Sequence, residues 1–378
     1  MRTPLSFPQL QEIRRTLAER IAQGMASEGQ QVACLPAFLA PPHASLQGRA
    51  LVVDAGGTNV RAALVDILGE ARSQVLAGPL SGTLPDGRHS ATTSEVFFGY
   101  QAELLHQLQA DLDLPLGYCF SYPAQVEPDG DARLLRWTKG IRVTGVEGQR
   151  VGEALLRAAR LKGPVKVLND TVACLLGGAY WAGNEAERSV GLIVGTGTNM
   201  AAFFPAESYP RFEGSRTGPM AVNLESGNFH PPHLCELDEE LDRASDNPGR
   251  QRYEKAVSGF YLPQLLARLH PELPVPAEAT SEWVVECSGR EGQAGESARW
   301  ILNRSADLVA AGLAGVADRL GVDSLVVQAE GGLFWKAPGY AARVEEKLST
   351  MLRSGNCRIV RGDEVNLVGA AVAALQGS

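Results

Sequence analysis

Two short glycine-rich segments carry residues that could hold phosphate. The first, Asp54 to Arg61, reads DAGGTNVR, and the second, Gly195 to Asn199, reads GTGTN. Glycine lacks a Cβ atom, so backbone N–H groups at such turns can come close to an anionic oxygen. Each segment alone could be an ordinary turn, but the pair favours phosphate binding. The residues expected to contact phosphate are Gly56, Gly57, Thr58, Asn59, Arg61, Gly195, Thr196, Gly197 and Thr198.

Asp54 stands at the end of the apolar run 51–53, directly before the first glycine turn. Magnesium is usually held through one or two carboxylates and keeps several of its waters. We therefore predict that Asp54 holds Mg²⁺ through water. The sequence contains no Gly-x-x-x-x-Gly-Lys-Ser/Thr motif, which excludes a P-loop nucleoside triphosphatase.

Asn169 and Asp170 follow the segment 165–168, which reads VKVL and resembles a buried strand. A carboxylate at the end of a strand can accept a hydroxyl proton, so Asp170 is a candidate general base. Either residue could also be the N-cap of the helical pattern at 172–180. The two roles are compatible, and both remain open at this stage.

Several polar residues stand among apolar neighbours and would need partners if they were buried. A ligand with many hydroxyl groups would supply such partners. Alone, these residues would more often be loop corners or surface carboxylates. They are Ser121, Thr138, Lys139, Glu225 and Glu254.

The elements around these residues indicate an α/β protein with two similar halves. Apolar runs flank both glycine turns, at 51–53 and 60–65 and again at 192–194 and 200–204, which predicts two hairpins. The turns lie 140 positions apart, from Gly57 to Gly197, so an internal duplication is plausible. Helical spacing of apolar residues predicts helices at 8–25, 301–320 and 365–375, and residues 36–48 are expected to be a connector.

Composition limits the classes of function. The chain has 378 residues, which favours two domains, and its 35 basic and 43 acidic residues give a net charge of −8. An acidic chain is not expected to bind nucleic acid generally. The start shows no secretory signal core and no run is long enough to cross a membrane, so we expect a cytoplasmic protein. The six cysteines form no Cys-x-x-Cys pair and are expected to be reduced thiols, without a zinc site.

In this order, the segments from about residue 51 to the C-terminus resemble the hexokinase family, specifically the eukaryotic-type hexokinases and glucokinases. The resemblance rests on segments at 120–123, 134–140, 168–172, 190–199, 223–227, 241–259 and 329–334. It implies the two-domain actin-like (ribonuclease H-like) ATPase fold with a central cleft. It also implies a small domain at 49–169 plus 363–378 and a large domain at 1–48 plus 170–362.

The resemblance further implies the activity: transfer of the γ-phosphoryl of MgATP to the 6-hydroxyl of a hexose, with Asp170 as the base and closure of the domains around the sugar. Gly331 and Gly332 match the adenosine segment of the family, although Ser or Thr is usual at position 332. Ser226 likewise replaces a common Trp, and a Thr-Arg-Gly segment is missing or shortened. The residues implied to contact the hexose are Ser121, Thr138, Lys139, Asn169, Asp170, Asn199, Glu225 and Glu254.

Two other functions use part of the same set of residues. A catalytically silent sugar-binding regulator would need the carboxylates that hold the sugar but neither Asp54 nor both glycine turns. An actin-like or chaperone-like ATPase would need the turns but not Lys139, Glu225 or Glu254. The expected ligands are a hexose and ATP, with no nucleic-acid or membrane partner, in a monomer or homodimer.

Overall fold

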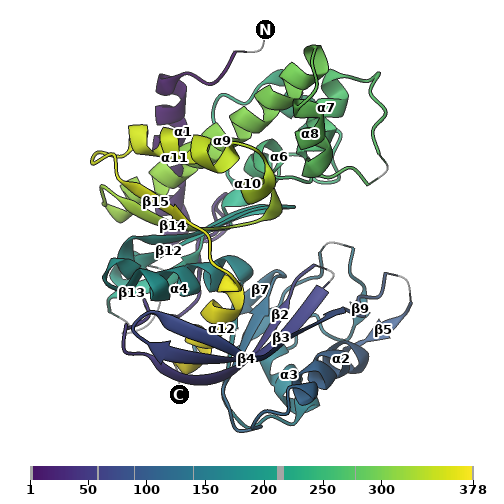
Figure 1. The fold of residues 1–378 in the computed structure, drawn as a ribbon, viewed down its shortest axis with the longest axis vertical. Coiled ribbons are helices and arrows are strands. Elements are labelled where there is room, and N and C mark those ends of the chain that lie inside the picture. Colours follow the sequence, from purple (N-terminus) through teal and green to yellow (C-terminus); the bar gives the residue numbers. More distant parts are fainter. Residues whose placement is uncertain are drawn as a thin grey trace.

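The structure is a computed structural model that describes residues 3–57, 59–88, 90–138, 140–210, 217–276 and 278–376. Two main β-sheets lie one above the other, and helices α4 (Asp170–Ala182) and α12 (Val365–Leu375) lie between them (Figure 1). The lower sheet in that view holds the first glycine turn and the upper sheet holds the second. Two similar sheet-and-helix halves were predicted from the sequence, and the structure confirms them.

The lower sheet has the strand order β10-β6-β2-β3-β4. Three of its strands, β10, β6 and β2, run parallel, and β2 and β3 form the predicted hairpin around the first glycine turn. Asp54 on β2 and Leu168 on β10 both pair with Cys119 on the central strand β6. The carboxyl ends of the parallel strands therefore meet at one edge, where ligands commonly bind in open α/β sheets. The strands are β2 (Gln47–Ala55), β3 (Asn59–Gly69), β4 (Arg72–Thr83), β6 (Leu116–Phe120) and β10 (Val165–Leu168).

The upper sheet has the strand order β1-β13-β12-β11-β14-β15. Strands β11 and β12 form the second predicted hairpin, and β14 and β15 continue the sheet in parallel from β11. The connector predicted at 36–48 overlaps strands at both ends, because β1 pairs with the edge strand β13 and β2 begins at Gln47. The strands are β1 (Leu35–Pro36), β11 (Ser189–Val194), β12 (Thr198–Pro205), β13 (Pro219–Asn223), β14 (Leu325–Glu330) and β15 (Cys357–Val360).

Glycines allow the two central helices to pack closely against their neighbours. A Cβ on Gly177 of α4 would lie 2.5 Å from the carbonyl oxygen of Val365, and one on Gly369 of α12 would lie 1.8 Å from that of Ala173. Helix α4 also packs on the upper sheet, where a Cβ on Gly178 would lie 2.4 Å from the Cβ of Gln328. Such distances are far below van der Waals contact, so these positions require glycine. The two helices thereby connect the sheets.

Helices α1 (Phe7–Ala26) and α9 (Gln293–Leu320) pack together above the upper sheet, and both confirm predicted helices (Figure 1). Helix α9 begins eight residues earlier than the apolar spacing indicated and ends as expected at Gly321, whose φ of 70° suits glycine. The other helices are α2 (Ser94–Gln107), α3 (Val151–Ala159), α5 (Glu236–Arg243), α6 (Arg252–Val257), α7 (Leu262–Leu269), α8 (Ser281–Ser288), α10 (Gly332–Lys336), α11 (Tyr340–Met351), η1 (Gly183–Arg188), η2 (Ala206–Ser208) and η3 (Ser226–Asn228).

Small two-stranded sheets complete the lower half. The division of the chain into a small domain at 49–169 plus 363–378 and a large domain at 1–48 plus 170–362 stays a prediction. The helices in the described part of the chain include none with the length and apolar character needed to cross a membrane. The remaining strands are β5 (Thr92–Thr93), β7 (Ala124–Val126), β8 (Ala132–Leu134) and β9 (Val143–Thr144).

Candidate active site

The first glycine turn connects the antiparallel strands β2 and β3. The Gly56 N–H donates to the carbonyl oxygen of Asn59 at 3.0 Å, which closes the turn. The hydroxyl of Tyr122 donates to the carbonyl oxygen of Gly56, so the turn is also held from the neighbouring loop. Gly56 and Gly57 are half-buried and Asn59 is exposed, whereas Thr58 lies outside the described residues.

Arg61 is the charged centre of this turn. Its guanidinium pairs with the Asp54 carboxylate at 2.7 Å and with the carboxylate of Glu364, which directly precedes α12. Burial disfavours the charged guanidinium, but Asp54 and Glu364 more than offset this, and the pKa of Arg61 is raised. Arg61 is therefore always charged, and it connects the turn to the start of α12.

The carboxyl edge of the lower sheet places the other candidate residues in a row. Ser121 follows β6, and its N–H donates to the carbonyl oxygen of Ala55 at 3.2 Å. Between β2 and β10 lies the Cys119 thiol, which is fully buried and interacts with the side chains of Asp54 and Ser121 and with the charge of Asp170. Burial, and then these carboxylates, hold the pKa of the thiol well above its usual range. This edge therefore brings Asp54, Ser121 and Asp170 together around one buried thiol.

Asn169 and Asp170 both serve at the N-terminus of α4. The Thr171 N–H donates to Asn169 Oδ1 at 3.0 Å and to Asp170 Oδ1 at 2.7 Å, and the Thr171 hydroxyl donates to the same Asp170 oxygen at 3.2 Å. The capping role that the sequence left open is thus confirmed. Within the described residues, the side-chain hydrogen bonds of Asp170 all involve Oδ1. This geometry fixes the carboxylate while its Oδ2 is left to act on a ligand.

An aromatic cluster supports the loop that carries Thr138. The rings of Phe120 and Tyr122 lie 4.8 Å apart, and Tyr122 and Trp137 lie 5.0 Å apart, between centroids. The Trp137 indole donates to the carbonyl oxygen of Val143 at 2.8 Å. Thr138 is half-buried beside this cluster, and Lys139 lies outside the described residues.

The second glycine turn is held by backbone and carboxylate contacts. Gly195 donates to the carbonyl oxygen of Gly197 at 2.9 Å and accepts from Gly259 at 2.7 Å, and Thr196 accepts from Phe260 at 3.2 Å. The segment of Gly331 and Gly332, predicted to contact adenosine, lies directly against the turn, since a Cβ on Gly195 would lie 3.4 Å from the Cα of Gly331 and 3.7 Å from the N of Gly332. Gly331 has a φ of 116° and approaches Val194 so closely that a Cβ would lie 2.2 Å from its oxygen. Only glycine fits there.

Next to this turn, polar side chains from three segments of the sequence form two hydrogen-bonded groups. The Thr198 N–H donates to Glu254 Oε2 at 3.2 Å, and Gln251 donates to Glu254 Oε1 at 2.9 Å. Asn199 and Glu225 are joined through Asn223, at 2.7 and 2.8 Å. Glu225, Gln251 and Glu364 all have left-handed backbones, with φ of 55°, 52° and 56°. Residues other than glycine pay for this conformation, and such positions cluster at functional sites.

Glu330, at the end of β14 in the upper sheet, interacts electrostatically with charged residues around the first glycine turn. Burial raises its pKa to about 7, against the opposing charges of Arg61 and Arg361. The carboxylates of Glu364 and Asp54 raise it further. An acidic residue of the upper sheet thus interacts with the phosphate-turn residues of the lower sheet.

The predicted residues fall into two groups. Lower-sheet residues Asp54, Ser121, Asn169 and Asp170 share one edge. In the upper half, Asn199 and Glu225 are joined through Asn223, and Glu254 is held separately by Thr198 and Gln251. Residues that the sequence reasoning missed are Asn223, Gln251, Glu330, Glu364 and Cys119. Gln251 lies three positions before Glu254 and could have been found from helical spacing, whereas Glu330 and Glu364 meet Arg61 only through the fold.

The edge fits the metal and nucleotide that were expected. Asp54 offers a carboxylate with only 12% of its side chain exposed, beside the half-buried backbone of Gly56 and Gly57. The described residues contain no group of three or more His, Cys, Asp or Glu that could hold a metal alone. Magnesium suits this arrangement, because it commonly takes one or two carboxylates and completes its shell with phosphate and water.

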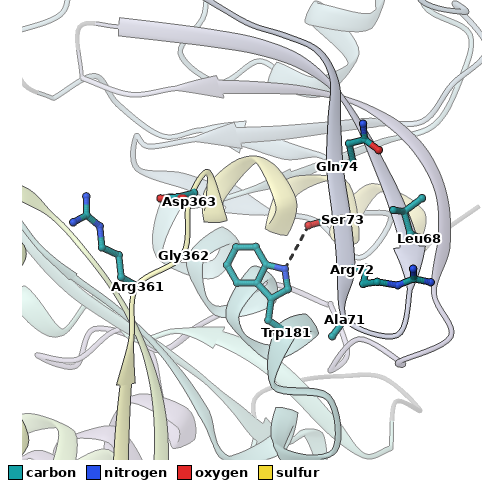
Figure 2. Close-up of a pocket in the computed structure, with 9 residues that line it drawn as sticks. All are labelled: Leu68, Ala71, Arg72, Ser73, Gln74, Trp181, Arg361, Gly362 and Asp363. Atoms are coloured by element: carbon teal, nitrogen blue, oxygen red, sulfur yellow. Dashed lines mark hydrogen bonds between the residues drawn. The ribbon is translucent and has the colours of Figure 1, made fainter.

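A pocket of about 670 Å³ lies between the tip of the β3–β4 hairpin and the segment 361–363 before α12, and its lining includes none of the residues predicted to bind the hexose or ATP (Figure 2). The Trp181 indole faces it and donates to the Ser73 hydroxyl at 3.4 Å. The side chains of Arg72 and Arg361 extend away from Trp181 in this view (Figure 2). The pocket is widely open to solvent.

Two family models, both described as hexokinase, match residues 2–180 and residues 189–273 with 295–376. The hexokinase of Schwanniomyces occidentalis is 31% identical over 68% of this chain, and the match covers 57% of that protein. Hexokinase-1 of Arabidopsis thaliana is 27% identical over 100% of this chain and 89% of the relative. The chain thus spans little more than half the length of the first curated relatives it matches.

Solved structures have the same fold. A hexokinase from Schistosoma mansoni complexed with glucose superposes with a TM-score of 0.82 at 24% identity, covering 98% of this chain and 96% of that one. A ROK family glucokinase from Streptomyces griseus, in complex with glucose and AMPPNP, has a TM-score of 0.58 at 20% identity and covers 87% of this chain and 100% of that one. The chain has the actin-like ATPase fold that was predicted.

Proposed function

The chain belongs to the hexokinase family, and on this premise we propose that it is an ATP-dependent hexokinase. It transfers the γ-phosphoryl of MgATP to the 6-hydroxyl of a hexose, with glucose as the first substrate to test. One observation carries the proposal: Asp170 stands at the strand edge that also carries Asp54, with its Oδ1 fixed by Thr171. The proposed base and the proposed phosphate-binding turn would then share a single edge.

Asp170 acts as the general base in this mechanism. Its fixed carboxylate accepts the proton of the hexose 6-hydroxyl as the oxygen attacks the γ-phosphorus. Ser121, Thr138, Lys139 and Asn169 contact the sugar from the lower half. Asn199, Glu225 and Glu254 contact it from the upper half, where their network already fixes their orientations. Positioning and charge stabilisation supply most of the rate enhancement in phosphoryl transfer.

The phosphates of the donor lie between the two turns. Backbone N–H groups of Gly57, Thr196 and Gly197 hold phosphate oxygens, because those of Gly56, Gly195 and Thr198 already donate within the protein. The side chains of Thr58 and Asn59 add further donors, and Arg61 supplies a permanent positive charge. Asp54 would hold Mg²⁺, which would supply positive charge to the phosphates. Gly331 and Gly332, which lie against the second turn, contact the adenosine part of the nucleotide.

Sugar contacts from both halves make closure dependent on the sugar. Water is smaller than a hexose, and Asp170 could also activate it, so an open site would hydrolyse ATP without product. When the hexose bridges the two groups of residues, its binding energy brings them together and excludes water. We therefore expect sugar-dependent release of ADP with little background hydrolysis.

The test is an assay of ADP release and hexose phosphate formation, with and without glucose. Glucose-dependent ADP release with product phosphorylated at the 6-position supports the proposal. Glucose binding without ADP release would instead identify a silent sugar-binding regulator, and sugar-independent release would identify an ordinary ATPase. A panel of hexoses and then of nucleotide donors defines specificity, because position 332 departs from the family pattern.

A further inference from the structure

The amide of Asn199 has a fixed orientation, set by the backbone. Its Oδ1 accepts from the N–H of Met200 at 2.8 Å and from the N–H of Ser226 at 3.1 Å. Backbone N–H groups can only donate, so this atom must be the oxygen, and both of its lone pairs are used. Its Nδ2 donates to Asn223 Oδ1 at 2.7 Å, and among the residues that the structure describes no other acceptor takes its second hydrogen, which can therefore serve a ligand.

Asn223 transmits this orientation to Glu225. Its Oδ1 receives the Asn199 hydrogen, so its Nδ2 must face the other way, where it donates to Glu225 Oε1 at 2.8 Å. Asn223 is only 6% exposed, at the end of β13, and its backbone pairs with Leu35 of β1 on one side and Ala201 of β12 on the other. Strands on both sides and two polar side chains thus hold a single rotamer of Asn223.

We infer that Asn223 is a positioning residue that makes Asn199 a donor and Glu225 an acceptor toward one group of the substrate. The inference rests on the proposed function and deepens it. A ligand group held by this pair must accept from Asn199 and donate to Glu225, and a hydroxyl does both. A keto oxygen only accepts and an ammonium only donates. The pair therefore forms a subsite for a sugar hydroxyl.

The first part of the test uses the wild-type protein and a series of monodeoxy and monofluoro glucose analogues, with binding measured calorimetrically without ATP. A fluorine replacing the hydroxyl cannot donate to Glu225, so it should not restore binding. We expect one position at which both replacements weaken binding by at least about tenfold, because a buried group is left unpaired. Equal affinity for every analogue would overturn the inference, whereas a wild type that binds no hexose would instead refute the proposed function.

The second part compares Asn223→Ala and Asn223→Asp with Asn356→Ala, a matched substitution of an exposed asparagine outside the site. Asn223→Ala should weaken hexose binding about 10- to 100-fold, since hydrogen bonds to a charged group are lost. It should also remove most of the discrimination at that one position. The KM for ATP should change less than about threefold, because the donor contacts lie elsewhere. The control should behave as wild type.

Asn223→Asp keeps the shape of the side chain and keeps the protein testable if the alanine variant does not fold. The new carboxylate cannot donate to Glu225 and repels it, so we expect a larger loss than for alanine at neutral pH. At lower pH the new carboxyl gains a proton and can donate, so hexose affinity should recover relative to wild type as the pH falls. Unchanged hexose affinity and discrimination in either folded variant would overturn the role of Asn223.

Discussion

The two glycine turns occupy equivalent places in the two sheets but are held by different forces. Around the first turn, Arg61 forms ion pairs with Asp54 and Glu364, and Glu330 lies close enough to have its pKa raised by both carboxylates. The second turn is held by backbone hydrogen bonds of Gly195, Thr196 and Thr198, and its charged partner is the carboxylate of Glu254. The two similar glycine turns thus differ in the charged groups that surround them.

This difference indicates a division of roles. A charged, partly exposed turn can exchange its internal ion pairs for contacts with phosphate and metal, because charged groups retain strong interactions when one partner replaces another. A turn held by short-range hydrogen bonds instead keeps its shape and can orient the polar groups of a sugar. We therefore expect substitutions at the first turn to change donor use alone. Substitutions at the second turn should change donor use and, through the neighbouring Asn199 and Glu254, hexose use as well.

The largest expected effect lies at the edge that serves both turns. Asp170→Asn keeps the capping bonds from Thr171 but removes the basic oxygen, so kcat should fall by a factor on the order of 10²–10⁴. Glucose affinity, measured by calorimetry, should change far less. Asp113→Asn, at an exposed aspartate remote from the site, is the control. A variant with near-normal kcat would show that Asp170 is not the base.

The second prediction separates the two turns by charge. Arg61→Ala removes a cation whose hydrogen bonds are to charged groups, so kcat/KM for ATP should fall about 10- to 100-fold. Glucose affinity should stay within about threefold of wild type, because Arg61 lies outside the sugar network. Arg49→Ala, in the exposed pair with Asp66, should change neither parameter. Equal losses for donor and hexose would contradict the division of roles.

The third prediction compares one glycine from each turn. A Cβ on Gly197 would lie 2.9 Å from Glu254 Oε2, whereas the nearest atom to a Cβ on Gly56 is the Asn59 oxygen at 3.5 Å, an ordinary contact. Gly197→Ala should therefore displace Glu254, raise the KM for hexose as well as that for ATP, and lower the free energy of unfolding by about 1–3 kcal/mol. Gly56→Ala should leave that free energy nearly unchanged and raise only the KM for ATP, as chemical denaturation and steady-state kinetics would show. A raised KM for hexose in Gly56→Ala, without one in Gly197→Ala, would contradict this comparison of the two turns.

The smallest effect concerns pH. The pKa of Glu330 is raised to about 7 by burial, so its ionised form is disfavoured in the folded state. Its contribution to stability is complete below the pKa of the unfolded chain and is lost as the pH rises through the folded value. Without Mg²⁺ and ligands, the Tm of wild type minus that of Glu330→Gln should decrease between about pH 5 and about pH 8. A difference that is constant or grows with pH would show that burial does not raise this pKa.

Local sequence signals were sufficient for the elements and for much of the site. The apolar runs on both sides of each glycine turn, within 51–65 and 192–204, predicted both hairpins. The cap at Asn169 was visible because N-cap chemistry is local. The start of α9 at Gln293 was missed because its first turns are polar on most sides and carry little periodicity.

The electrostatic part of the site could not be predicted in this way. Glu364 reaches Arg61 only because α12 returns to the lower sheet, and Glu330 approaches Asp54 only because the sheets face each other. Asn223 is different: it lies two positions before Glu225 in the same strand-end segment, yet its partner Asn199 is on a neighbouring strand. Pairing between strands, which sequence spacing does not reveal, makes it a positioning residue.

A crystal structure with glucose and a non-hydrolysable ATP analogue would test the central claim most directly. The account predicts the glucose 6-hydroxyl oxygen at hydrogen-bond distance, about 2.6–3.2 Å, from the Asp170 carboxylate, with the γ-phosphorus on the opposite side of that oxygen and the β- and γ-phosphates between the two turns. A bound sugar whose 6-hydroxyl is distant from Asp170, or phosphates remote from Gly56 and Gly195, would contradict it.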